Sequence, residues 1–307
     1  MRVLVTGSSG FVGSYLVKEF VANGYDVICS DINSENNTIE MNIMDYNSVH
    51  DVVKKYEPDL IVNSAGQADV GVSWKKPQHT FELNTIGFIN IMEAVKHCEA
   101  DTRIIGIGSS DEYGALKEKG INVTENIALN PVTPYGISKA SMEHIAELYV
   151  KTYKMDICIA RLFNLGGAGQ SKGFIISDFS SGIAEIENGK KSFLSVGNLE
   201  SSRDFTHVKD ACRAIRLIGE KGYSGDVYNI CSGITHKASE ILEILLKLSN
   251  TKITIKQDES KLRPSDTPVI CGNHDKITEH TGWIPKYEFK DIISDALGYW
   301  RSKYITG

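Results

Sequence analysis

The first 23 residues of the chain constrain its fold more than any other stretch. Residues 2–6 form a short apolar run, and Gly7-Ser-Ser-Gly10-Phe-Val-Gly13 follows at once. Apolar residues then recur at helical spacing, and Gly24 can end the helix. Strand, glycine turn and helix in this order are the context that a dinucleotide-binding fingerprint requires. The sequence therefore predicts that a dinucleotide binds at this turn, and the alternative is an ordinary glycine-containing loop.

Each glycine of the turn has its own physical reason. Gly7 permits a tight turn, Gly10 lets a pyrophosphate approach the backbone, and Gly13 allows the helix to pack closely on the strand. The amides at the start of the helix then receive the anion.

A second strand is predicted at 26–30, and it ends in Asp31, eighteen residues after Gly13. An acidic side chain at this place can accept hydrogen bonds from the adenosine ribose and repels a 2′-phosphate. No Arg or Lys occurs between Cys29 and Glu40, so no nearby cation would hold such a phosphate. The sequence favours NAD(H) over NADP(H) as the cofactor, and the alternative reading of Asp31 is a solvated loop aspartate.

Strand and helix alternate through the first half of the chain. The predicted strands are 2–6, 26–30, 59–63, 103–108 and 156–161, and the predicted helices are 11–23, 46–56, 78–97 and 135–154. This alternation predicts an α/β fold of the Rossmann type, a doubly wound parallel sheet with helices on both faces.

The pattern is mixed beyond about residue 165, with loops at 166–173 and 264–268 and further helices at 207–220, 236–249 and 289–304. No low-complexity linker separates the two regions. We therefore expect residues 1–165, together with about 207–230, to form the NAD-binding domain. Residues from about 166–206 and 231–307 are expected to form a smaller, interleaved C-terminal subdomain that binds the substrate.

Composition restricts the class of partner. The 33 basic and 39 acidic residues give a net charge of −6, which argues against nucleic acid or a membrane surface. No apolar run reaches the length of a transmembrane helix, and Met1 leads directly into the first predicted strand. The six cysteines are scattered without a Cys-x-x-Cys pair, so reduced thiols and no metal site are predicted. We expect a cytoplasmic enzyme.

Residues 133–139, Thr-Pro-Tyr-Gly-Ile-Ser-Lys, place Tyr135 and Lys139 four residues apart at a helix start. Thr133 can cap this helix, and Pro134 suits its first turn. Residues at i and i+4 share one helical face, which brings the ammonium near the phenol and favours the phenolate. Tyr135 is therefore a candidate acid or base for the proton of a sugar hydroxyl. The alternative is a pair of ordinary surface helix residues, since Tyr-x-x-x-Lys alone is a common pattern.

Three segments together resemble the extended short-chain dehydrogenase/reductase family: Thr6-Gly7-x-x-Gly10-Phe-Val-Gly13, Ser109-Ser110-Asp111-Glu112-Tyr113-Gly114 and Pro134-Tyr135-Gly-x-x-Lys139. Further matches are Gly66-Gln-Ala-x-Val-x-x-Ser73-Trp74, Arg161-x-Phe-Asn164, Gly169-Gln170, Arg203-Asp-Phe-x-x-Val-x-Asp210, and Arg263-Pro-Ser-Asp266 followed by Thr281-Gly-Trp283-x-Pro285. With them the chain is most similar to GDP-4-keto-6-deoxy-D-mannose reductases and next to GDP-mannose 4,6-dehydratases, over essentially its whole length.

The resemblance implies roles for the matched residues. The family's serine lies five residues before the glycine of Tyr-Gly, at Ser109, and would hydrogen-bond the C4 oxygen of the sugar while Tyr135 transfers the proton. Lys139 would hold the nicotinamide ribose, and the nicotinamide would carry the hydride. The alternative for Ser109 is an ordinary turn residue. The implied cofactor contacts are Gly7, Gly10, Phe11, Val12, Gly13, Asp31, Ile32, Asn42, Ile43, Ala65, Gly66, Asn84, Tyr135 and Lys139.

The nucleoside diphosphate of the implied substrate needs cationic side chains, although the net charge of the chain is negative. Arg203 and Arg263 fit as planar donors to phosphate oxygens, and Asn164 fits as a neutral donor. The alternative for Arg203 is a structural pairing with Asp204 or Asp210. The substrate contacts implied by the resemblance are Ser110, Asn164, Arg203, Arg263, Ser265 and Asp266.

Three positions depart from the family's pattern. Relatives often carry Asp where Asn42 stands, Ala168 replaces a proline in the loop before Gln170, and Asp178 stands where dehydratases tend to place a nucleotide-binding lysine. The last difference puts dehydratase-type guanine contacts in doubt.

Each candidate reaction has its own requirements. A reductase needs Ser109, Tyr135, Lys139 and a cofactor that exchanges after each turnover. A 4,6-dehydratase also needs a carboxyl base, for which Asp111 is the catalytic candidate, with a shorter reach than the family's glutamate. An NAD-preferring site instead suits a C4 dehydrogenase or an epimerase. The remaining alternative is a non-catalytic module that senses a dinucleotide. Such a module would not require Ser109, Tyr135 and Lys139 together.

We therefore predict an NAD(P)-dependent oxidoreductase that acts at C4 of a GDP-linked mannose-type sugar. A GDP-4-keto-6-deoxy-sugar reductase is the first choice, and the alternatives are a GDP-sugar 4-dehydrogenase or epimerase and then a GDP-mannose 4,6-dehydratase. Both a hexose and a heptose are compatible with the sequence. The resemblance also implies a homodimer.

Overall fold

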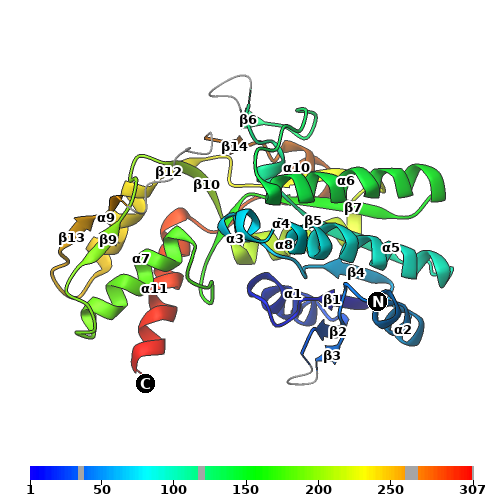
Figure 1. Cartoon of the computed structure of the whole chain (residues 1–307), viewed down its shortest axis with the longest axis horizontal. Helices are drawn as coiled ribbons and strands as arrows, with labels where there is room; N and C mark the ends of the chain where they lie inside the picture. The colour runs from blue at the N-terminus through cyan, green and yellow to red at the C-terminus, as the bar shows by residue number, and fades with distance from the viewer. Residues whose placement is uncertain (34–37, 117–121, 260–268, 306–307) are drawn as a thin grey trace.

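The computed structural model describes residues 1–33, 38–116, 122–259 and 269–305 (Figure 1). A seven-stranded sheet has the order β11-β7-β5-β4-β1-β2-β3, and every neighbouring pair in it is parallel. The strands are β1 (Arg2–Thr6), β2 (Asp26–Asp31), β3 (Ile39–Glu40), β4 (Leu60–Asn63), β5 (Arg103–Ser109), β7 (Ile157–Leu162) and β11 (Val227–Ile230). The predicted doubly wound parallel sheet is confirmed. Its strand order reverses between β1 and β4, and such sheets bind ligands at the carboxyl ends of the strands near that point.

Both faces of the sheet are buried, because successive side chains of a strand point to opposite sides. Val3 and Val5 of β1 belong to an apolar cluster with residues of α1 (Phe11–Ala22) and α8 (Val208–Lys221), whereas Leu4 lies in the cluster of the other face. That face is covered by α2 (Tyr46–Tyr56), α5 (Gly87–His97) and α6 (Pro134–Tyr153) (Figure 1). The catalytic candidates of β5 and α6 therefore stand on well-packed elements.

The helix predicted at 78–97 is divided in the structure. It consists of α4 (Pro77–Phe81), a π-helical turn η1 (Glu82–Ile86) and α5. A π-turn inserts one extra residue into a helix and often marks a functional site. Here the turn carries Asn84, whose amide group donates to the Gln67 carbonyl and the Ser138 hydroxyl.

The second part of the chain has an apolar core of its own, to one side of the large sheet (Figure 1). Its helices are α7 (Ile175–Glu187), α9 (Ala238–Leu248) and α11 (Phe289–Ile305), and β9 (Leu194–Val196) pairs with β13 (Ile255–Gln257). A three-stranded sheet, β12 (Thr235–Lys237), β10 (Ser202–His207) and β8 (Asn164–Gly166), contacts both α8 and α11 through β10. The remaining elements are α3 (Val70–Lys75), η2 (Ser110–Glu112), β6 (Asn122–Val123), β14 (Cys271–Gly272) and α10 (Asp275–Thr281).

Helix α7 is not predicted by the pattern of its residues. Ser177, Ser181 and Gly182 lower the intrinsic helix propensity of this segment. In the structure these small residues are buried, and a Cβ on Gly182 would lie only 2.4 Å from the Leu194 Cδ1. The small residues therefore permit close packing, which outweighs their low propensity.

All six cysteines are free, in agreement with the prediction of reduced thiols, and Cys158, Cys212 and Cys231 are buried. Burial raises the pKa of the Cys212 thiol well above its ordinary value, so this group is unreactive. Within the described ranges, no helix is both long and apolar enough to cross a membrane.

Candidate active site

The glycine turn lies between β1 and α1, as the sequence predicts. Gly7 has a φ of +62°, which favours glycine, and a Cβ there would lie 2.8 Å from backbone atoms of the loop after β4. A Cβ on Gly13 would lie 2.0 Å from the Gly7 carbonyl oxygen. Gly10 precedes α1 in an extended conformation, and Phe11 and Val12 begin the helix. The glycines therefore let β1, the turn and α1 pack closely, and the amides at the start of α1 are suited to receive an anion such as a dinucleotide pyrophosphate.

Asp31 lies at the carboxyl end of β2, beside the glycine turn. Its Oδ2 accepts a hydrogen bond from the Ser9 amide at 3.0 Å, and its Oδ1 accepts one from the Ile32 amide at 2.7 Å. The backbone thus holds the carboxylate in place, which a freely solvated aspartate would not show. The side chain of Ile32 is exposed beside it.

Asn42 and Ile43 follow β3. The Asn42 Oδ1 accepts a hydrogen bond from the Met44 amide at 3.0 Å. The Ile43 side chain is buried in the core, where its Cδ1 would lie 2.7 Å from a Cβ on Gly87. Any contact of Ile43 with a cofactor would therefore come from its backbone.

The loop after β4 carries Ala65 and Gly66 and is braced by Asn84. The Asn84 Oδ1 accepts a hydrogen bond from the Gln67 amide at 2.8 Å, and the Ala65 amide donates to the Thr6 hydroxyl at 3.1 Å. Asn84 is 1% exposed, and its amide group is engaged within the protein. Its position indicates that it supports the loop.

Ser109, Tyr135 and Lys139 meet at the carboxyl end of β5. Ser109 ends this strand, and its hydroxyl lies near enough to the Tyr135 phenol to lower the pKa of that phenol. Tyr135 lies in the first turn of α6, where the Thr133 hydroxyl accepts a hydrogen bond from the Gly136 amide at 3.0 Å, as the sequence predicts. The Lys139 ammonium donates to the Ile107 carbonyl at 2.7 Å and would lie 3.6 Å from a Cβ on Gly66.

The electrostatics of Tyr135 correct the expectation drawn from the sequence. Burial raises the pKa of the Tyr135 phenol, and the Asp111 carboxylate raises it further, while the nearby Ser109 hydroxyl opposes both. The phenolate form that the sequence favoured is therefore not the one favoured in the structure, because burial outweighs the groups that lower this pKa. Burial also lowers the pKa of the Lys139 ammonium to about 8. The pair therefore consists of a firmly protonated phenol and a lysine that titrates near neutrality.

Sequence reasoning assigned no role to Glu112, which the structure turns inward. Its side chain is 0% exposed, and its Oε1 accepts a hydrogen bond from the Ser109 amide at 2.6 Å. The spacing Ser109-x-x-Glu112 is that of a capping box, which could have revealed this contact.

The candidate substrate residues lie on the three-stranded sheet and at η2. Asn164 on β8 donates to the Asp204 carbonyl at 3.3 Å, and Arg203 on β10 donates to the Ser202 carbonyl at 2.7 Å. Ser110 begins η2, directly after Ser109. The remaining candidates, Arg263, Ser265 and Asp266, lie outside the described residues.

The carboxylates proposed as structural partners of Arg203 are engaged with other groups. Asp204 accepts hydrogen bonds from the amide and hydroxyl of Ser232 and from the amides of Gly233 and Gly272. Asp210 pairs with Arg213 and accepts from the amides of Lys286 and Tyr287.

Two departures from the family's pattern also have a place in the structure. The Ala168 carbonyl accepts a hydrogen bond from the Tyr15 hydroxyl of α1 at 2.9 Å, which ties this loop to the cofactor side. Asp178 lies in the first turn of α7, and its Oδ1 accepts a hydrogen bond from the Gly173 amide at 2.9 Å.

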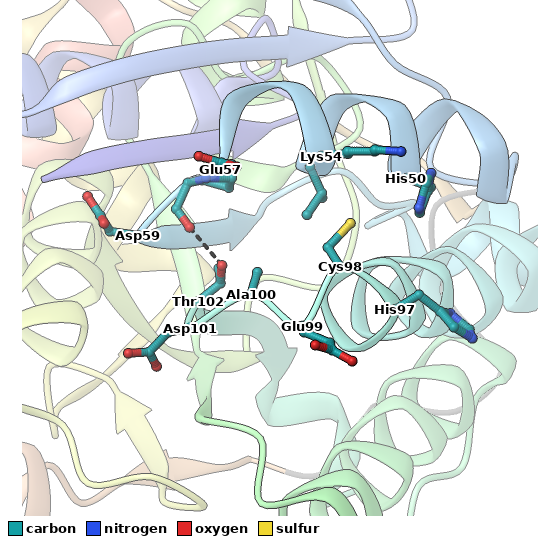
Figure 2. Close-up of a pocket in the computed structure, with 12 residues that line it drawn as sticks. His50, Lys54, Glu57, Asp59, His97, Cys98, Glu99, Ala100, Asp101 and Thr102 are labelled. Atoms are coloured by element: carbon teal, nitrogen blue, oxygen red, sulfur yellow. Dashed lines mark hydrogen bonds between the residues drawn. The ribbon is translucent and has the colours of Figure 1, made fainter.

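A hollow of about 530 Å³ lies away from these residues, between the C-terminal ends of α2 and α5 (Figure 2). It is lined by His50, Lys54, Glu57, His97 and Cys98 among others, at the amino ends of β4 and β5. Doubly wound sheets bind their ligands at the opposite, carboxyl ends, where Ser109 and Asp31 stand. The hollow is therefore separate from the candidate active site.

The parallel sheet, the glycine turn after β1 and the serine, tyrosine and lysine at the carboxyl end of β5 define an enzyme of the extended short-chain dehydrogenase/reductase type. Known proteins agree with this class. The chain is 29% identical to the GDP-6-deoxy-D-mannose reductase of Pseudomonas aeruginosa over 98% of both chains. It is 30% identical to the GDP-6-deoxy-D-talose 4-dehydrogenase of Aggregatibacter actinomycetemcomitans over 92% of both.

Solved structures agree as well. RMD from Pseudomonas aeruginosa complexed with NADPH superposes with a TM-score of 0.89 at 29% identity, covering 98% of this chain and 99% of that one. The UDP-glucose 4-epimerase of Thermus thermophilus complexed with NAD gives a TM-score of 0.87 at 25% identity, with 98% and 99% covered. A model of the GDP-mannose 4,6 dehydratase family matches residues 4–296, and the chain belongs to this family.

Proposed function

We propose that the protein is a nicotinamide-dependent reductase that acts on the C4 keto group of a GDP-linked 4-keto-6-deoxymannose. The observation that carries the proposal is that Ser109 and Tyr135 lie close together at the carboxyl end of β5, where the Lys139 ammonium donates to the Ile107 carbonyl of the same strand and the glycine turn lies alongside. The relatives named as GDP-6-deoxy-D-mannose reductase and RMD support this choice.

The cofactor would be held by the glycine turn, Asp31 and the loop after β4, and it would supply the hydride to C4. Tyr135 would give its proton to the C4 oxygen. An ordinary phenol is protonated at neutral pH, and burial and Asp111 raise the pKa of Tyr135 further, so Tyr135 holds the proton that it would donate in reduction. Ser109 would hold the same oxygen, and Lys139 would hold the nicotinamide ribose.

We further propose that the enzyme prefers NAD(H) to NADP(H). The Asp31 carboxylate is fixed by two amides beside the glycine turn, where a 2′-phosphate would meet its charge. Replacing Asp31 by Asn keeps an acceptor and removes the charge, so NADPH should bind more tightly to Asp31→Asn than to the wild type, with a smaller change for NADH. Fluorescence titration measures both, and an equal change for the two cofactors would refute the role of Asp31.

We propose that residues 1–165 with about 207–230 bind the cofactor, and that about 166–206 and 231–307 bind the GDP-sugar. Asn164, Arg203 and Ser110 would then face the nucleotide sugar, together with Arg263, Ser265 and Asp266. Loss of GDP binding in Arg203→Gln, with unchanged NADH binding, would support this division. Equal loss of both ligands would contradict it.

A cytoplasmic homodimer is also part of the proposal. The apolar stripe of α6 is split in the structure, with Met142 buried in the core and Ile137 and Leu148 exposed at 43% and 57%. The exposed pair would lie in the seam between two copies of α6. Light scattering should report a dimer in the wild type and a monomer after Leu148→Arg, whereas a monomeric wild type would refute the seam.

The first test is NADH consumption with GDP-4-keto-6-deoxymannose as substrate. The proposal predicts oxidation of many equivalents of NADH per enzyme in the wild type and almost none in Tyr135→Phe. The second candidate is a C4 dehydrogenase, favoured by the 30% identical relative of that name and by the fixed Asp31. NADH formation from a GDP-6-deoxysugar and NAD, without the reverse reaction, would favour that candidate.

A further inference from the structure

Behind Ser109 lies a buried cluster of carboxyl groups around one guanidinium. Glu112, Arg161 and Glu143 are 0%, 3% and 8% exposed. The Arg161 Nε donates to the Glu143 carboxylate at 2.9 Å, and its Nη2 donates to the other oxygen of the same carboxylate. The Arg161 Nη1 donates to the Tyr113 hydroxyl at 2.8 Å and to the Glu125 carbonyl at 3.4 Å. Every nitrogen of the guanidinium is therefore engaged without Glu112.

The two oxygens of Glu112 have different surroundings. Oε1 accepts the hydrogen bond from the Ser109 amide, at 2.6 Å. Oε2 is buried, has no hydrogen-bond donor among the described residues, and lies 3.7 Å from the Arg161 Nε. The Glu143 carboxylate lies beside it, since both carboxyl groups approach the same Arg161 Nε, at 2.9 and 3.7 Å. A buried oxygen without a donor is costly as an anion, but it is satisfied if it carries a proton and donates it to the neighbouring carboxylate.

The charges around Glu112 also favour its protonated form. The ionisable groups around Glu112 are Glu143, Lys139 and Tyr135 on α6, Arg161 on β7, Asp111 on η2, and Tyr113 and Glu125 beside Arg161. Glu143 already neutralises Arg161 through two hydrogen bonds, and the Lys139 ammonium is directed to the Ile107 carbonyl. A second ionised carboxylate would leave one negative charge uncompensated in a dry interior.

We propose that Glu112 is a neutral positioning residue, which keeps its proton, donates it to Glu143, and holds the backbone of Ser109 with its other oxygen. Gly108 makes the room for it, since a Cβ there would lie 2.7 Å from the Glu112 Oε1. The burial of Glu112 and the charge of Glu143 raise its pKa well above the ordinary value, against the effect of Arg161. Glu112 thereby fixes Ser109 without adding charge behind the catalytic groups.

The first test uses Glu112→Gln, because an amide reproduces both hydrogen bonds of the neutral acid. Infrared spectra at neutral pH should show the band of a buried carboxylic acid in the wild type, and this band should be missing in Glu112→Gln. The alkaline limb of kcat/KM for NADH should coincide in the two proteins, since removing a neutral group leaves the pKa of Lys139 unchanged. A downward shift of that limb, or identical infrared spectra, would overturn the proposal.

The second test measures stability against pH. If Glu112 is neutral, the folded protein keeps a proton on this side chain. The unfolded chain loses the same proton above the ordinary glutamate pKa of about 4.3. Above that pH the folding equilibrium constant of the wild type should fall about tenfold per pH unit relative to that of Glu112→Gln. The fall should end at the pKa that Glu112 has in the folded protein. A difference in stability that does not vary with pH would mean that Glu112 is ionised, and would refute the proposal.

Glu143→Gln is the matched control. It removes the charge that neutralises Arg161, so it should destabilise the protein and draw Glu112 into its ionised form, with loss of the infrared band. The opposite pattern, a stable Glu143→Gln and a Glu112→Gln chain that fails to fold, would place the proton on Glu143.

Glu112→Leu lacks the acceptor for the Ser109 amide, and its kcat should fall with little change in KM for NADH. Full activity in Glu112→Leu would refute the positioning role. These measurements, other than the kinetic ones, do not depend on the identity of the sugar.

Discussion

The titration of Lys139 leads to a quantitative prediction for the pH dependence of the reaction. Its side chain is 6% exposed, and burial lowers the pKa of the ammonium to about 8. Above this pH the lysine loses the charge that we propose holds the nicotinamide ribose. Because kcat/KM reports the ionisation of the free enzyme, kcat/KM for NADH should fall about tenfold per pH unit in this alkaline range. A lysine with an ordinary pKa of about 10.4 would keep the rate constant over the same range.

Stability should change in the opposite direction. The pKa of Lys139 is lower in the folded state than in the unfolded chain, so between the two values the unfolded chain binds more protons. The free energy of unfolding therefore rises with pH from about 8. The shift from an ordinary value of about 10.4 corresponds to about 3 kcal/mol. Lys139→Met lacks this contribution, so the stability of the wild type relative to Lys139→Met should rise by this amount across the window.

The assay is the initial rate at limiting NADH and saturating keto sugar, from neutral to alkaline pH, with denaturant unfolding on the same samples. Lys139→Arg is the control, because a guanidinium keeps its charge throughout and should abolish the alkaline limb in whatever activity remains. A wild-type rate that stays constant up to the ordinary lysine pKa, or an unchanged limb in Lys139→Arg, would refute the reasoning.

Three further substitutions, one of them paired with a control substitution, test other parts of the protein. Tyr135→Phe should lower kcat by about 100-fold or more, on the scale of lost general acid catalysis, with little change in KM; a loss confined to KM would count against its role. Gly13→Ala should abolish NADH binding in titrations, because its Cβ would lie 2.0 Å from the Gly7 carbonyl oxygen. Gly298→Ala on α11 is the control: a Cβ there has no atom within 4 Å, so this substitution should stabilise the protein by about 0.5 kcal/mol or more in thermal unfolding. Asp204→Asn should destabilise the protein by about 1–3 kcal/mol, because its amide group would face donors of Ser232, Gly233 or Gly272; an unchanged midpoint of unfolding would contradict this.

The first half of the fold could be predicted because its signals are local. The strand at residues 2–6, the helix at 46–56 and the cap of Thr133 all depend on neighbouring residues, and the structure has each of them. Helix α7 could not be predicted, because its small residues become favourable only when they pack against Leu194. The π-turn at 82–86 likewise depends on a distant partner, since Asn84 bonds to Gln67 and Ser138.

In the candidate site too, features that depend on neighbouring residues could be predicted, and features that depend on distant residues could not. The spacing of Tyr135 and Lys139 predicts their shared helix, and the order of β1, glycine turn and α1 predicts the turn. The pKa of Tyr135 could not be predicted, because it depends on burial and on Asp111 from another element. The inward turn of Glu112 depends on Arg161 and Glu143 in the same way.

Transfer of hydride to C4 of the sugar is tested most directly with NADH that carries deuterium at both hydrogen positions of C4 of its nicotinamide ring. The enzyme would be given GDP-4-keto-6-deoxymannose, and the isolated GDP-sugar would be examined by NMR. The proposed reaction predicts one deuterium at C4 of the product sugar and none elsewhere. A product without deuterium at C4, or with deuterium at another carbon, would contradict the proposed reaction.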